Sequence, residues 1–441
     1  MDTPQPRQSP FRTVAAVLLT LSAAAVAAGA GLVGVRSYTP SPLARTDAET
    51  VADALPRLAF VGDALREGAG EDMQGLFPEG YFFSHALYGL TWLDVADRET
   101  AHRSEALAEA RWALERLDSP AGTAPFPAEG SPAHGVFHSG WSNWLRGRIV
   151  SVAGGPESAE AEMDTLNTAT AELSAAFDSS IGRGTPFLDA YPGQAWPVDS
   201  VVAVAALRLR DDLAGDGRNT ELVERWITAA SALPDPATGL LPHRVDSGDG
   251  STVQGARASS QSLLLRFLYE IDPEWAAVDY AVFRELFSSP HLMLPGVREY
   301  PRGDDSPGDV DSGPLLFGLS ASASTVALAG AVLLRDEPAA SALTGFAEAS
   351  GAAVEFNGKR RYLGGTLPVG DAFLMWSLAT VPALSGQVEP VATHQVGPWW
   401  RVPWHLATLI PSAALVWAAL RAWRPTPRGA VERFCTDHRP A

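Results

Sequence analysis

Two residue types are almost missing from this sequence. Its 441 residues include a single cysteine, Cys435, and a single lysine, Lys359, so arginine carries nearly all of the positive charge. Charged residues make up only 19% of the chain and apolar residues 46%, a composition typical of a globular or partly membrane-embedded protein rather than a disordered one. Because Cys435 lies close to the end, the long middle of the chain has no disulfide, no thiolate metal site and no thiol nucleophile.

Two hydrophobic runs are long enough to cross a bilayer, which takes about 20 residues. Residues 13–35 carry no charge, and residues 402–420 contain only His405 as a titratable group. A cleaved signal peptide is the alternative for the first run, but the run is long for that role, so we expect a retained anchor. Tryptophans flank the second run as in an interfacial belt: Trp399, Trp400, Trp404, Trp417 and Trp423.

The arginines predict the orientation of these two transmembrane helices. Residues 421–441 form a basic tail, which the positive-inside rule places in the cytoplasm, and two spans then place residues 1–12 there as well. The domain between them, residues 47–383, is therefore expected outside the cytoplasm. Residues 37–398 contain 24 basic and 48 acidic residues, a net charge of −24. Such a domain is repelled by nucleic acid, so we expect no nucleic-acid partner.

Helical periodicity dominates the outer domain. Apolar residues recur at i, i+3, i+4 and i+7 in twelve segments: 48–66, 81–97, 100–117, 137–153, 157–178, 195–213, 219–233, 257–270, 273–288, 313–334, 336–350 and 370–381. Alternating patterns typical of strands are confined to two short hairpins expected near 240–254 and 354–365. The sequence therefore predicts an all-α domain.

Connection lengths indicate how these helices are arranged. Long connections rich in Gly, Pro, acids and aromatics precede every second helix, those near 81, 137, 195, 257, 313 and 370, and the other connections are short. This alternation predicts an (α/α)6 barrel, in which six loops entering the inner helices form one rim. An open helical repeat stack is the alternative. We favour the closed barrel, because function carried by rim loops explains why long and short connections alternate.

The first two rim loops contain an acid and two histidines among aromatics. Glu79 stands within a run of aromatic residues that would raise the pKa of a carboxyl group, although the same run would also serve to seal the end of a barrel. His134 and His138 are four residues apart, a spacing used by metal ligands on a helix. Since His134 lies in a Gly/Pro loop and no third ligand follows, we expect no metal, and His138 is either an acid/base group or a structural histidine.

The third rim loop is the richest in candidate site residues. Tyr191, Trp196 and Asp199 precede or begin an apolar helix, and Asp199 falls in its first turn. A carboxylate at that position caps a helix in many proteins, which is one interpretation of Asp199. Ser200 is an alternative cap, however, and Asp199 would then point from the rim toward the barrel axis.

The remaining rim loops add further charged candidates. His243, Arg244, Gln254 and Arg257 lie in the fourth, Glu299, Asp309 and Asp311 in the fifth, and Asp371 follows the sixth. Asp309 and Asp311 are spaced as in part of a calcium loop, but the remaining ligand spacing is missing. Asp311 also makes a plausible helix start. Each carboxylate alone is weak evidence. Together they fall near inner-helix N-termini, where opposed carboxylates serve as acid and base across a central pocket.

The order of these motifs resembles that of the linalool dehydratase-isomerase family, a group of (α/α)6-barrel proteins. The similarity is clearest over residues 186–290, where Pro192, the segment 196–207, the turn 233–239 and the stretch 271–275 fall in the family's order and spacing. Weaker matches cover 83–97, 140–154 and 361–376. The resemblance implies the barrel fold and acid/base chemistry in its pocket.

The resemblance also shows where the chain departs from the family. The characterised terpene-alcohol enzyme of the family uses two cysteines flanking the third rim loop, and the matching positions here are Ala190 and Asp199. Its active-site histidine falls at about Trp141, with His138 one turn away. Linalool chemistry is therefore not implied by the resemblance.

These observations predict a membrane-anchored extracytoplasmic enzyme, lyase/isomerase-like or glycan-active, that works on a neutral small-molecule or glycan substrate without a cofactor or metal. Asp199 is the expected central acid or base, opposed by Asp311 or Glu299. We expect the remaining candidates to orient or bind substrate: His138, Tyr191, Trp196, Trp141, Glu79, Arg257 and Asp371. The alternative is a non-catalytic envelope protein whose pocket binds a ligand or partner. That protein would tolerate amides in place of the rim carboxylates.

Overall fold

The computed structural model describes residues 10–289, 294–384, 389–391 and 397–424. Residues 1–9 of the predicted cytoplasmic N-terminus and the basic tail beyond residue 424, with Cys435, lie outside the described residues. The chain divides into two compact units. One consists of Met1–Val35 and Arg401–Ala441, and the other is Arg36–Trp400.

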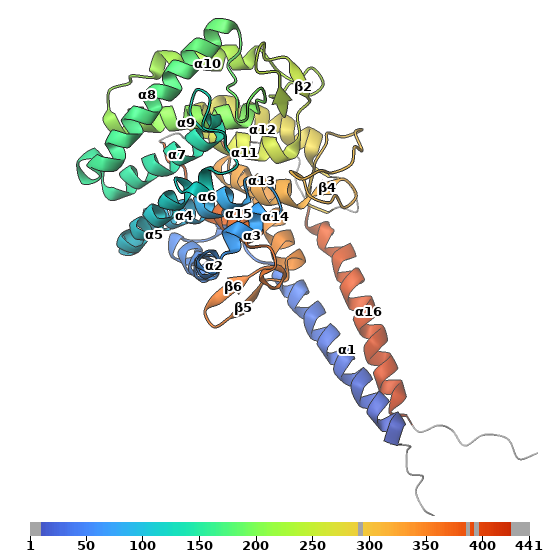
Figure 1. Cartoon of the computed structure of the whole chain (residues 1–441). Helices are drawn as coiled ribbons and strands as arrows, with labels where there is room; N and C mark the ends of the chain where they lie inside the picture. Colours follow the sequence, from blue (N-terminus) through green and yellow to red (C-terminus); the bar gives the residue numbers. More distant parts are fainter. Residues whose placement is uncertain (1–9, 290–293, 385–388, 392–396, 425–441) are drawn as a thin grey trace, which may run out of the picture. The chain divides into compact units, whose positions relative to one another are not determined.

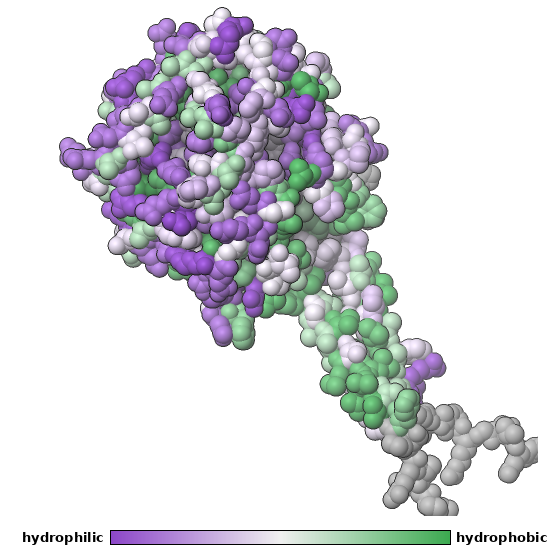
Figure 2. Space-filling model, in the orientation of Figure 1, coloured by the Kyte–Doolittle hydropathy of each residue, from purple (hydrophilic) through white to green (hydrophobic). Residues whose placement is uncertain are grey.

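The smaller unit is a pair of apolar helices, α1 (Pro10–Arg36) and α16 (Arg401–Ala422). Among the described residues, the segments Thr13–Arg36 and Pro398–Ala422 are long and apolar enough to cross a membrane. Only 17% and 11% of their most apolar windows are buried, unlike a helix in the core of a soluble domain, and Figure 2 shows their apolar surface. The two helices run antiparallel, because Trp423 Nε1 donates a hydrogen bond to Thr20 Oγ1 at 2.9 Å while the His405 ring lies beside Gly34.

Six inner helices of the larger unit form a closed ring among the described residues. They are α4 (Gly80–Arg98), α7 (Gly135–Ala153), α9 (Pro197–Ala214), α11 (Ala258–Ile271), α13 (Ala321–Leu333) and α15 (Pro368–Ala379). Each inner helix contacts the next one along the chain, and α15 returns to contact α4. The ring is thus closed within the described residues, which confirms the predicted barrel and excludes the open repeat stack.

Six outer helices cover the ring, with α5, α8 and α10 at its periphery in Figure 1. The outer helices are α2 (Asp47–Arg66), α5 (Arg103–Leu117), α8 (Glu160–Arg183), α10 (Thr220–Ser231), α12 (Pro273–Phe287) and α14 (Glu337–Ser350). Each packs on the inner helix that follows or precedes it. Helix α10 buries one stripe, including Leu222 and Trp226, whereas nearly all of α4 is buried. The chain is therefore an (α/α)6 barrel.

Long and short connections alternate as the sequence predicts. The six long ones, here called rim connections one to six, precede the inner helices and span 67–79, 118–134, 184–196, 232–257, 288–320 and 351–367. They contain α3 (Ala69–Gln74), α6 (Pro120–Thr123), η5 (Leu363–Gly365) and three antiparallel hairpins. Other one-turn helices are η1 (Pro42–Ala44), η2 (Thr100–His102), η3 (Pro156–Ser158) and η6 (Pro398–Trp400). All six rim connections lead into the N-terminal end of the ring, so their residues meet at one mouth.

Two of the three hairpins were expected from the sequence. Strands β1 (Arg244–Val245) and β2 (Thr252–Gln254) form one, and β5 (Val354–Phe356) and β6 (Lys359–Arg361) form another, with Val354 opposite Arg361. The third, β3 (Val297–Arg298) with β4 (Leu319–Ser320), was not predicted. It takes up part of the segment 313–334 that periodicity assigns to a helix.

The start of α13 corrects that prediction. The helix begins at Ala321, where the Ser320 side chain caps the backbone N–H of Ala323 at 3.2 Å. Gly313, Phe317 and Gly318 all have positive φ (64°, 52° and 79°), which an α-helix cannot contain. Asp311 therefore lies in an irregular loop and not at a helix start.

Candidate active site

Aromatic side chains of the inner helices fill the barrel below its mouth. Trp141 of α7 is 1% exposed, and its ring centroid lies 5.0 Å from that of Phe267 and 5.3 Å from that of Phe83. Trp376 of α15 completes the layer at 6.1 Å. These rings give the mouth an apolar floor. Trp141, expected from the sequence to orient or bind substrate, therefore lies in this packed layer.

Asp199 stands at the mouth in the first turn of α9. The helix starts there because Pro197 occupies its first turn and Trp196 precedes it with an extended backbone. Among the described residues, no backbone N–H of α9 donates a hydrogen bond to the Asp199 carboxyl group, which argues against the capping interpretation. The alternative cap, Ser200, instead accepts a hydrogen bond from the backbone N–H of Leu188 at 3.0 Å.

The carboxyl group of Asp199 is buried beside two other acids. The residue is only 7% exposed, and within the described part of the chain no hydrogen bond joins its carboxyl group to the protein. Burial, together with the negative charges of Glu79 and Asp311, raises the pKa of Asp199 well above its ordinary value. Asp199 therefore favours the protonated form and is suited to donate a proton. We call Glu79, Asp199 and Asp311 the acid cluster.

Glu79 and Tyr191 bring rim connections one and three together. The Tyr191 hydroxyl donates a short hydrogen bond to Glu79 Oε1. The Tyr191 ring stacks on Phe126 at 5.7 Å and meets Trp196 edge-on at 6.0 Å. Burial and the neighbouring negative charges, that of Glu79 first, raise the pKa of Tyr191, so its hydroxyl keeps its proton. Half-buried Trp196 and Tyr191 thus form an aromatic wall next to the acids.

Asp311 faces the other two acids from rim connection five, with 47% of its side chain exposed. His243 of rim connection four, itself 3% exposed, places Nε2 at 3.6 Å from Asp311 Oδ2, while its Nδ1 contacts the hydroxyl of Ser260. The surrounding protein and the charge of Asp309 raise the pKa of Asp311 to about 6. Burial lowers the pKa of His243 to about 3, so its ring is neutral.

Arg257 and Glu299 form a buried group beside Asp311. Glu299, predicted as the opposing catalytic acid, is 0% exposed and accepts hydrogen bonds from Arg257 Nε at 2.9 Å and Ser259 Oγ at 2.7 Å. Arg257, predicted to bind substrate, is 4% exposed and donates its two Nη atoms to the Asp309 carboxylate at 2.5 and 2.7 Å. Arg257 is thus held on both edges by carboxylates, and Glu299 is bonded through Oε1 while its buried Oε2 has no hydrogen-bond partner among the described residues. Neither residue is exposed at the mouth, where the sequence predicted contacts with substrate.

Asp371 belongs to a different group of charges. Its Oδ1 accepts a hydrogen bond from the backbone N–H of Tyr362 at 2.9 Å, and burial raises its pKa to about 8 against the attraction of Arg57 and Arg361. Arg57 is part of what we call the arginine cluster: Asp53, Arg57, Glu348 and Arg360. The structure therefore does not bring Asp371 into the acid cluster, and its predicted contact with substrate gains no support.

His138 lies to one side of the acid cluster. It is 8% exposed, and its Nε2 is 3.3 Å from the carbonyl oxygen of Leu117 at the end of α5. Its ring packs against Phe82 at 5.4 Å and His134 at 5.3 Å. Burial lowers the pKa of His138, which favours the neutral ring. These contacts match the structural alternative that the sequence left open.

No metal centre is seen among the described residues: no group of three or more His, Cys, Asp or Glu side chains there is arranged to hold an ion. The partial calcium-loop pattern has another explanation. Asp309 accepts hydrogen bonds from the backbone N–H groups of Asp311 at 3.1 Å and Ser312 at 3.2 Å, and both of its oxygens bind Arg257. This is an Asx-type turn closed by an ion pair.

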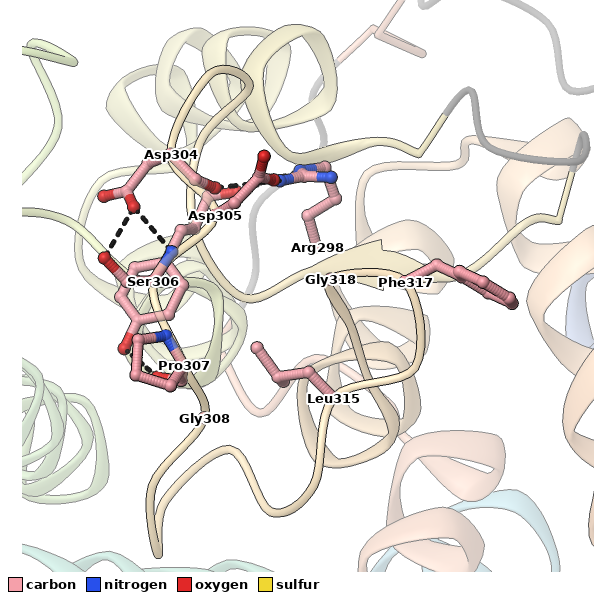
Figure 3. A pocket seen from close by; sticks show the side chains of 10 residues that line it. Arg298, Asp304, Asp305, Ser306, Pro307, Gly308, Leu315, Phe317 and Gly318 are labelled. Carbon is pink, nitrogen blue, oxygen red and sulfur yellow. Dashed lines mark hydrogen bonds and ion pairs between the residues drawn. The ribbon is translucent and has the colours of Figure 1, made fainter.

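A hollow of about 550 Å³ lies within rim connection five. Figure 3 shows Arg298 directed at the Asp305 carboxylate, at 2.7 Å, and Phe317 pointing away from both. Tyr300 lines this hollow and also packs against the guanidinium of Arg257, 5.2 Å from its ring centroid. The hollow thus adjoins the Arg257 group without including a carboxylate of the acid cluster.

The roles of two residues, His243 and Asp309, do not follow from the sequence alone. In the sequence, His243 is one of several polar residues in rim connection four. Its contact with Asp311 links positions 68 residues apart, and no local spacing reveals such a contact. The two-residue spacing of Asp309 and Asp311, which also fits part of a calcium loop, is the signal of an Asx-type turn.

Comparison with protein-family models found no match, and comparison with curated proteins found none either. Among solved structures, an unsaturated glucuronyl hydrolase specific for heparin is similar over 75% of this chain and 96% of its own, with 11% sequence identity and a TM-score of 0.48. The assignment of the (α/α)6 barrel rests on the closed ring of helix contacts described above.

Proposed function

We propose that the barrel is an acid/base enzyme, of lyase, isomerase or glycan-active type, whose reaction takes place at the acid cluster. The observation that carries this proposal is the state of Asp199. It is a buried carboxyl group in the first turn of an inner helix, free of any capping bond, beside two other acids. Burying a carboxyl group without a hydrogen-bond partner lowers the stability of the fold. In many proteins, a buried acid of this kind belongs to a functional site.

The two raised pKa values divide the roles between Asp199 and Asp311. Asp199, whose pKa is raised well above its ordinary value by burial and by Glu79 and Asp311, favours the protonated form and acts as the general acid. Asp311, with a pKa of about 6, is mostly ionised at neutral pH and acts as the general base. In an elimination, Asp199 protonates the departing oxygen while Asp311 removes a proton from the adjacent carbon, which leaves a double bond. In a hydrolysis, Asp311 instead takes a proton from the attacking water. Proton exchange with solvent then resets both groups.

The charge of the site favours a neutral substrate. The acid cluster contains no arginine, and the nearby Arg257 is held by Glu299 and Asp309. An anionic group at the mouth would be repelled by Asp311 and by the domain's net charge. Trp196 and Tyr191 supply aromatic faces suited to a sugar ring or a hydrocarbon. The resemblance to the linalool dehydratase-isomerase family supports an acid/base reaction at this position, with Asp199 in place of a cysteine.

Activity of Asp199→Asn tests this proposal. The wild type and the variant are assayed against neutral aryl glycosides and tertiary allylic alcohols. We expect a loss of about 10²–10⁴-fold in kcat, the range for removal of a general acid, with the thermal midpoint not lowered. Asp279→Asn is the matched control, because Asp279 is also a buried acid with a pKa raised to about 7 but lies on outer helix α12.

Three results are decisive. Equal activity of Asp199→Asn and wild type would overturn the proposed chemistry. Loss of the folded barrel together with activity would make Asp199 a structural residue. Binding of a sugar or alcohol that survives the substitution, without turnover by the wild type, would favour the non-catalytic ligand-binding protein.

We further propose that α1 and α16 anchor the protein in a membrane with the barrel outside the cytoplasm. Length, apolar surface and the basic residues after α16 support this placement. Cys435 is the only cysteine, so a membrane-impermeant maleimide reports the side of the C-terminal tail. In intact cells we expect the reagent not to label the wild type, whose cysteine lies in the tail. We expect it to label a double variant in which Cys435→Ser removes that cysteine and Ser289→Cys places one in the barrel. Labelling of Cys435 in intact cells would reverse the orientation.

A further inference from the structure

The loop that carries Asp311 is attached to the barrel by a chain of charged side chains. The chain begins at Glu299, which is 0% exposed and whose Oε1 accepts hydrogen bonds from Arg257 and Ser259. Because a buried carboxylate without a cation is costly, this contact fixes the Nε edge of the Arg257 guanidinium. Arg257 is also the residue immediately before α11, so its backbone is fixed by an inner helix.

The opposite edge of Arg257 holds Asp309. Nη1 and Nη2 donate to the two carboxylate oxygens at 2.5 and 2.7 Å, a bidentate pair whose geometry a lysine cannot reproduce. The face of the guanidinium packs against Tyr300, at 5.2 Å from its ring centroid. The Nε edge, the Nη edge and one face of the Arg257 guanidinium are therefore each in contact with a neighbouring side chain.

Asp309 in turn fixes the backbone of Asp311. Its Oδ1 accepts the N–H groups of Asp311 at 3.1 Å and Ser312 at 3.2 Å, and Ser312 Oγ accepts the N–H of Asp309 at 2.9 Å. The first turn of α13 holds only the carbonyl side of Asp311, which accepts a hydrogen bond from Ser322 Oγ at 3.0 Å, so the turn closed by Asp309 fixes the N–H side. Arg257 thus acts on the position of the general base through Asp309, alongside the contacts of Asp311 with Ser322 and His243.

We propose that Arg257 is a positioning residue, which holds Asp311 at the mouth through Asp309 and keeps it in the ionised state that a base requires. This inference rests on the proposed function of Asp311. It replaces the expected contact of Arg257 with substrate by an action through a second side chain. The charged and titratable groups that face or influence Asp311 are His243 of rim connection four, Asp309 and Glu299 of rim connection five, Glu79 of rim connection one, Tyr191 of rim connection three, Asp199 of α9, and Arg257.

Arg257 is the cation in this set, since His243 is neutral. Its removal takes away an attraction that favours the ionised form of Asp311 and leaves the negative charge of Asp309 beside it. The pKa of Asp311 should therefore rise. An opposite charge at this range changes a carboxyl pKa by about one to three units, and we expect a rise of about one unit or more.

The test reads the pKa of Asp311 from stability, so it needs no substrate. The free energy of unfolding of the full-length protein in detergent is measured from pH 4 to pH 9 for four proteins: wild type, Asp311→Asn, Arg257→Gln and the double variant. A carboxyl with a raised folded pKa stabilises the fold less and less as pH increases, until that folded pKa is passed. The free energy of unfolding of the wild type minus that of Asp311→Asn should thus decrease as pH rises from about 4, and it should stop changing near pH 6.

In the Arg257→Gln background the same difference should become flat at a higher pH, by about one unit or more. An unchanged inflection would overturn the proposal, whatever the loss of stability. Arg284→Gln is the matched control, since Arg284 pairs with Asp336 between outer helices and its removal should lower stability without moving the inflection. If Arg257→Gln does not fold, Arg257→Lys replaces it. Lysine can pair with only one oxygen, so the inflection should move in the same direction by less, and no movement would again overturn the proposal.

The outcome is separable from that of the proposed function. A moved inflection in a protein that turns over none of the tested substrates would support the coupling between Arg257 and Asp311 and reject the chemistry. An unmoved inflection in an active enzyme would keep Asp311 as the base and remove Arg257 from its control.

Discussion

The arginine cluster and the acid cluster show two ways in which the same barrel accommodates buried carboxyl groups. In the arginine cluster every acid has a cation. Arg57 Nη2 donates to Asp53 at 3.0 Å and to Glu348 at 2.7 Å, and Arg360 donates to Asp53 at 2.8 Å. In the acid cluster, by contrast, Asp199 has no hydrogen-bond partner among the described residues and faces two further acids.

The pKa shifts of Asp53 and Asp199 differ in sign for this reason. Burial raises the pKa of Asp53, but Arg57, Arg45 and Arg360 more than offset burial and hold it below its ordinary value. Burial also raises the pKa of Asp199, and there the neighbouring charges add to the effect. Paired acids serve the fold: the arginine cluster ties α2, the first outer helix, to α14, the last, and so supports ring closure. Unpaired acids cost stability, and where several of them meet at the mouth of the barrel, a chemical role is the simplest reason to keep them.

The largest effect is expected in the arginine cluster. Glu348→Gln removes one negative charge from a site that is 1% exposed and leaves Arg57 and Arg360 short of a partner. Breaking a buried ion pair in this way costs about 3–5 kcal/mol. We expect a loss of that size in the free energy of unfolding, measured by denaturant titration at neutral pH.

Glu355→Gln is the control for that experiment. Glu355 lies on the exposed strand β5 of the neighbouring hairpin, so its substitution should change stability by no more than about 0.5 kcal/mol. Equal effects of the two substitutions would mean that the arginine cluster contributes nothing beyond surface charge, and the contrast between the clusters would disappear.

The pH dependence of activity should show the state of Asp311. On any substrate that the barrel turns over, kcat/KM should fall about tenfold for each pH unit below the pKa of Asp311, about 6, because the base becomes protonated. At high pH the rate should fall again as Asp199 loses its proton. Asp311→Asn should abolish the decrease of kcat/KM below pH 6, and it should also remove most of the activity. A rate that stays level down to pH 4 would exclude Asp311 as the base.

Much of the fold could be predicted because it is determined locally. The twelve helices follow the 3.6-residue periodicity, and the alternation of long and short connections is enough to order them into two layers. The start of α13 could not be predicted this way. The apolar residues Leu315, Leu316 and Leu319 continue the helical pattern, yet the left-handed backbone of Gly313 and Gly318 prevents a helix there. A glycine in a sequence does not reveal its φ angle.

The site was predictable only in part, because its contacts are remote in sequence. Asp199 and Glu79 could be found, since each lies at the start of an inner helix and such positions meet at the mouth. Whether an acid is paired depends on distant residues, however. Glu348 meets Arg57 across 291 positions, and Asp309 meets Arg257 across 52. Sequence spacing therefore grouped Asp371 and Glu299 with Asp199, whereas their partners place them elsewhere.

Asp199→Asn should stabilise the barrel, the opposite sign to Glu348→Gln. The pKa of Asp199 is higher in the folded state, so the folded protein binds more protons than the unfolded one, and stability falls as pH rises from the ordinary pKa toward the folded one. An amide has no such dependence. We expect a gain of about 0.5–2 kcal/mol at neutral pH, increasing with pH above about 4, in denaturant titrations over that range. A gain that is the same at pH 4 and pH 8 would show that the carboxyl is ionised in the folded protein.

The smallest effect is expected from Tyr191→Phe. This substitution tests whether the raised pKa of Asp199 is caused by the charge of Glu79 or by the hydrogen bond between Tyr191 and Glu79. The substitution removes the hydrogen bond to Glu79 but leaves the charge of that half-buried carboxylate, which water can then solvate. Stability should fall by about 1 kcal/mol or less. The pH-dependent gain from Asp199→Asn should be unchanged in this background, because the charge that acts on Asp199 is still present. In a Glu79→Gln background the gain should shrink, because that charge is gone. If Tyr191→Phe shrinks the gain as much as Glu79→Gln does, the hydrogen bond controls Asp199 and the repulsion between carboxylates does not.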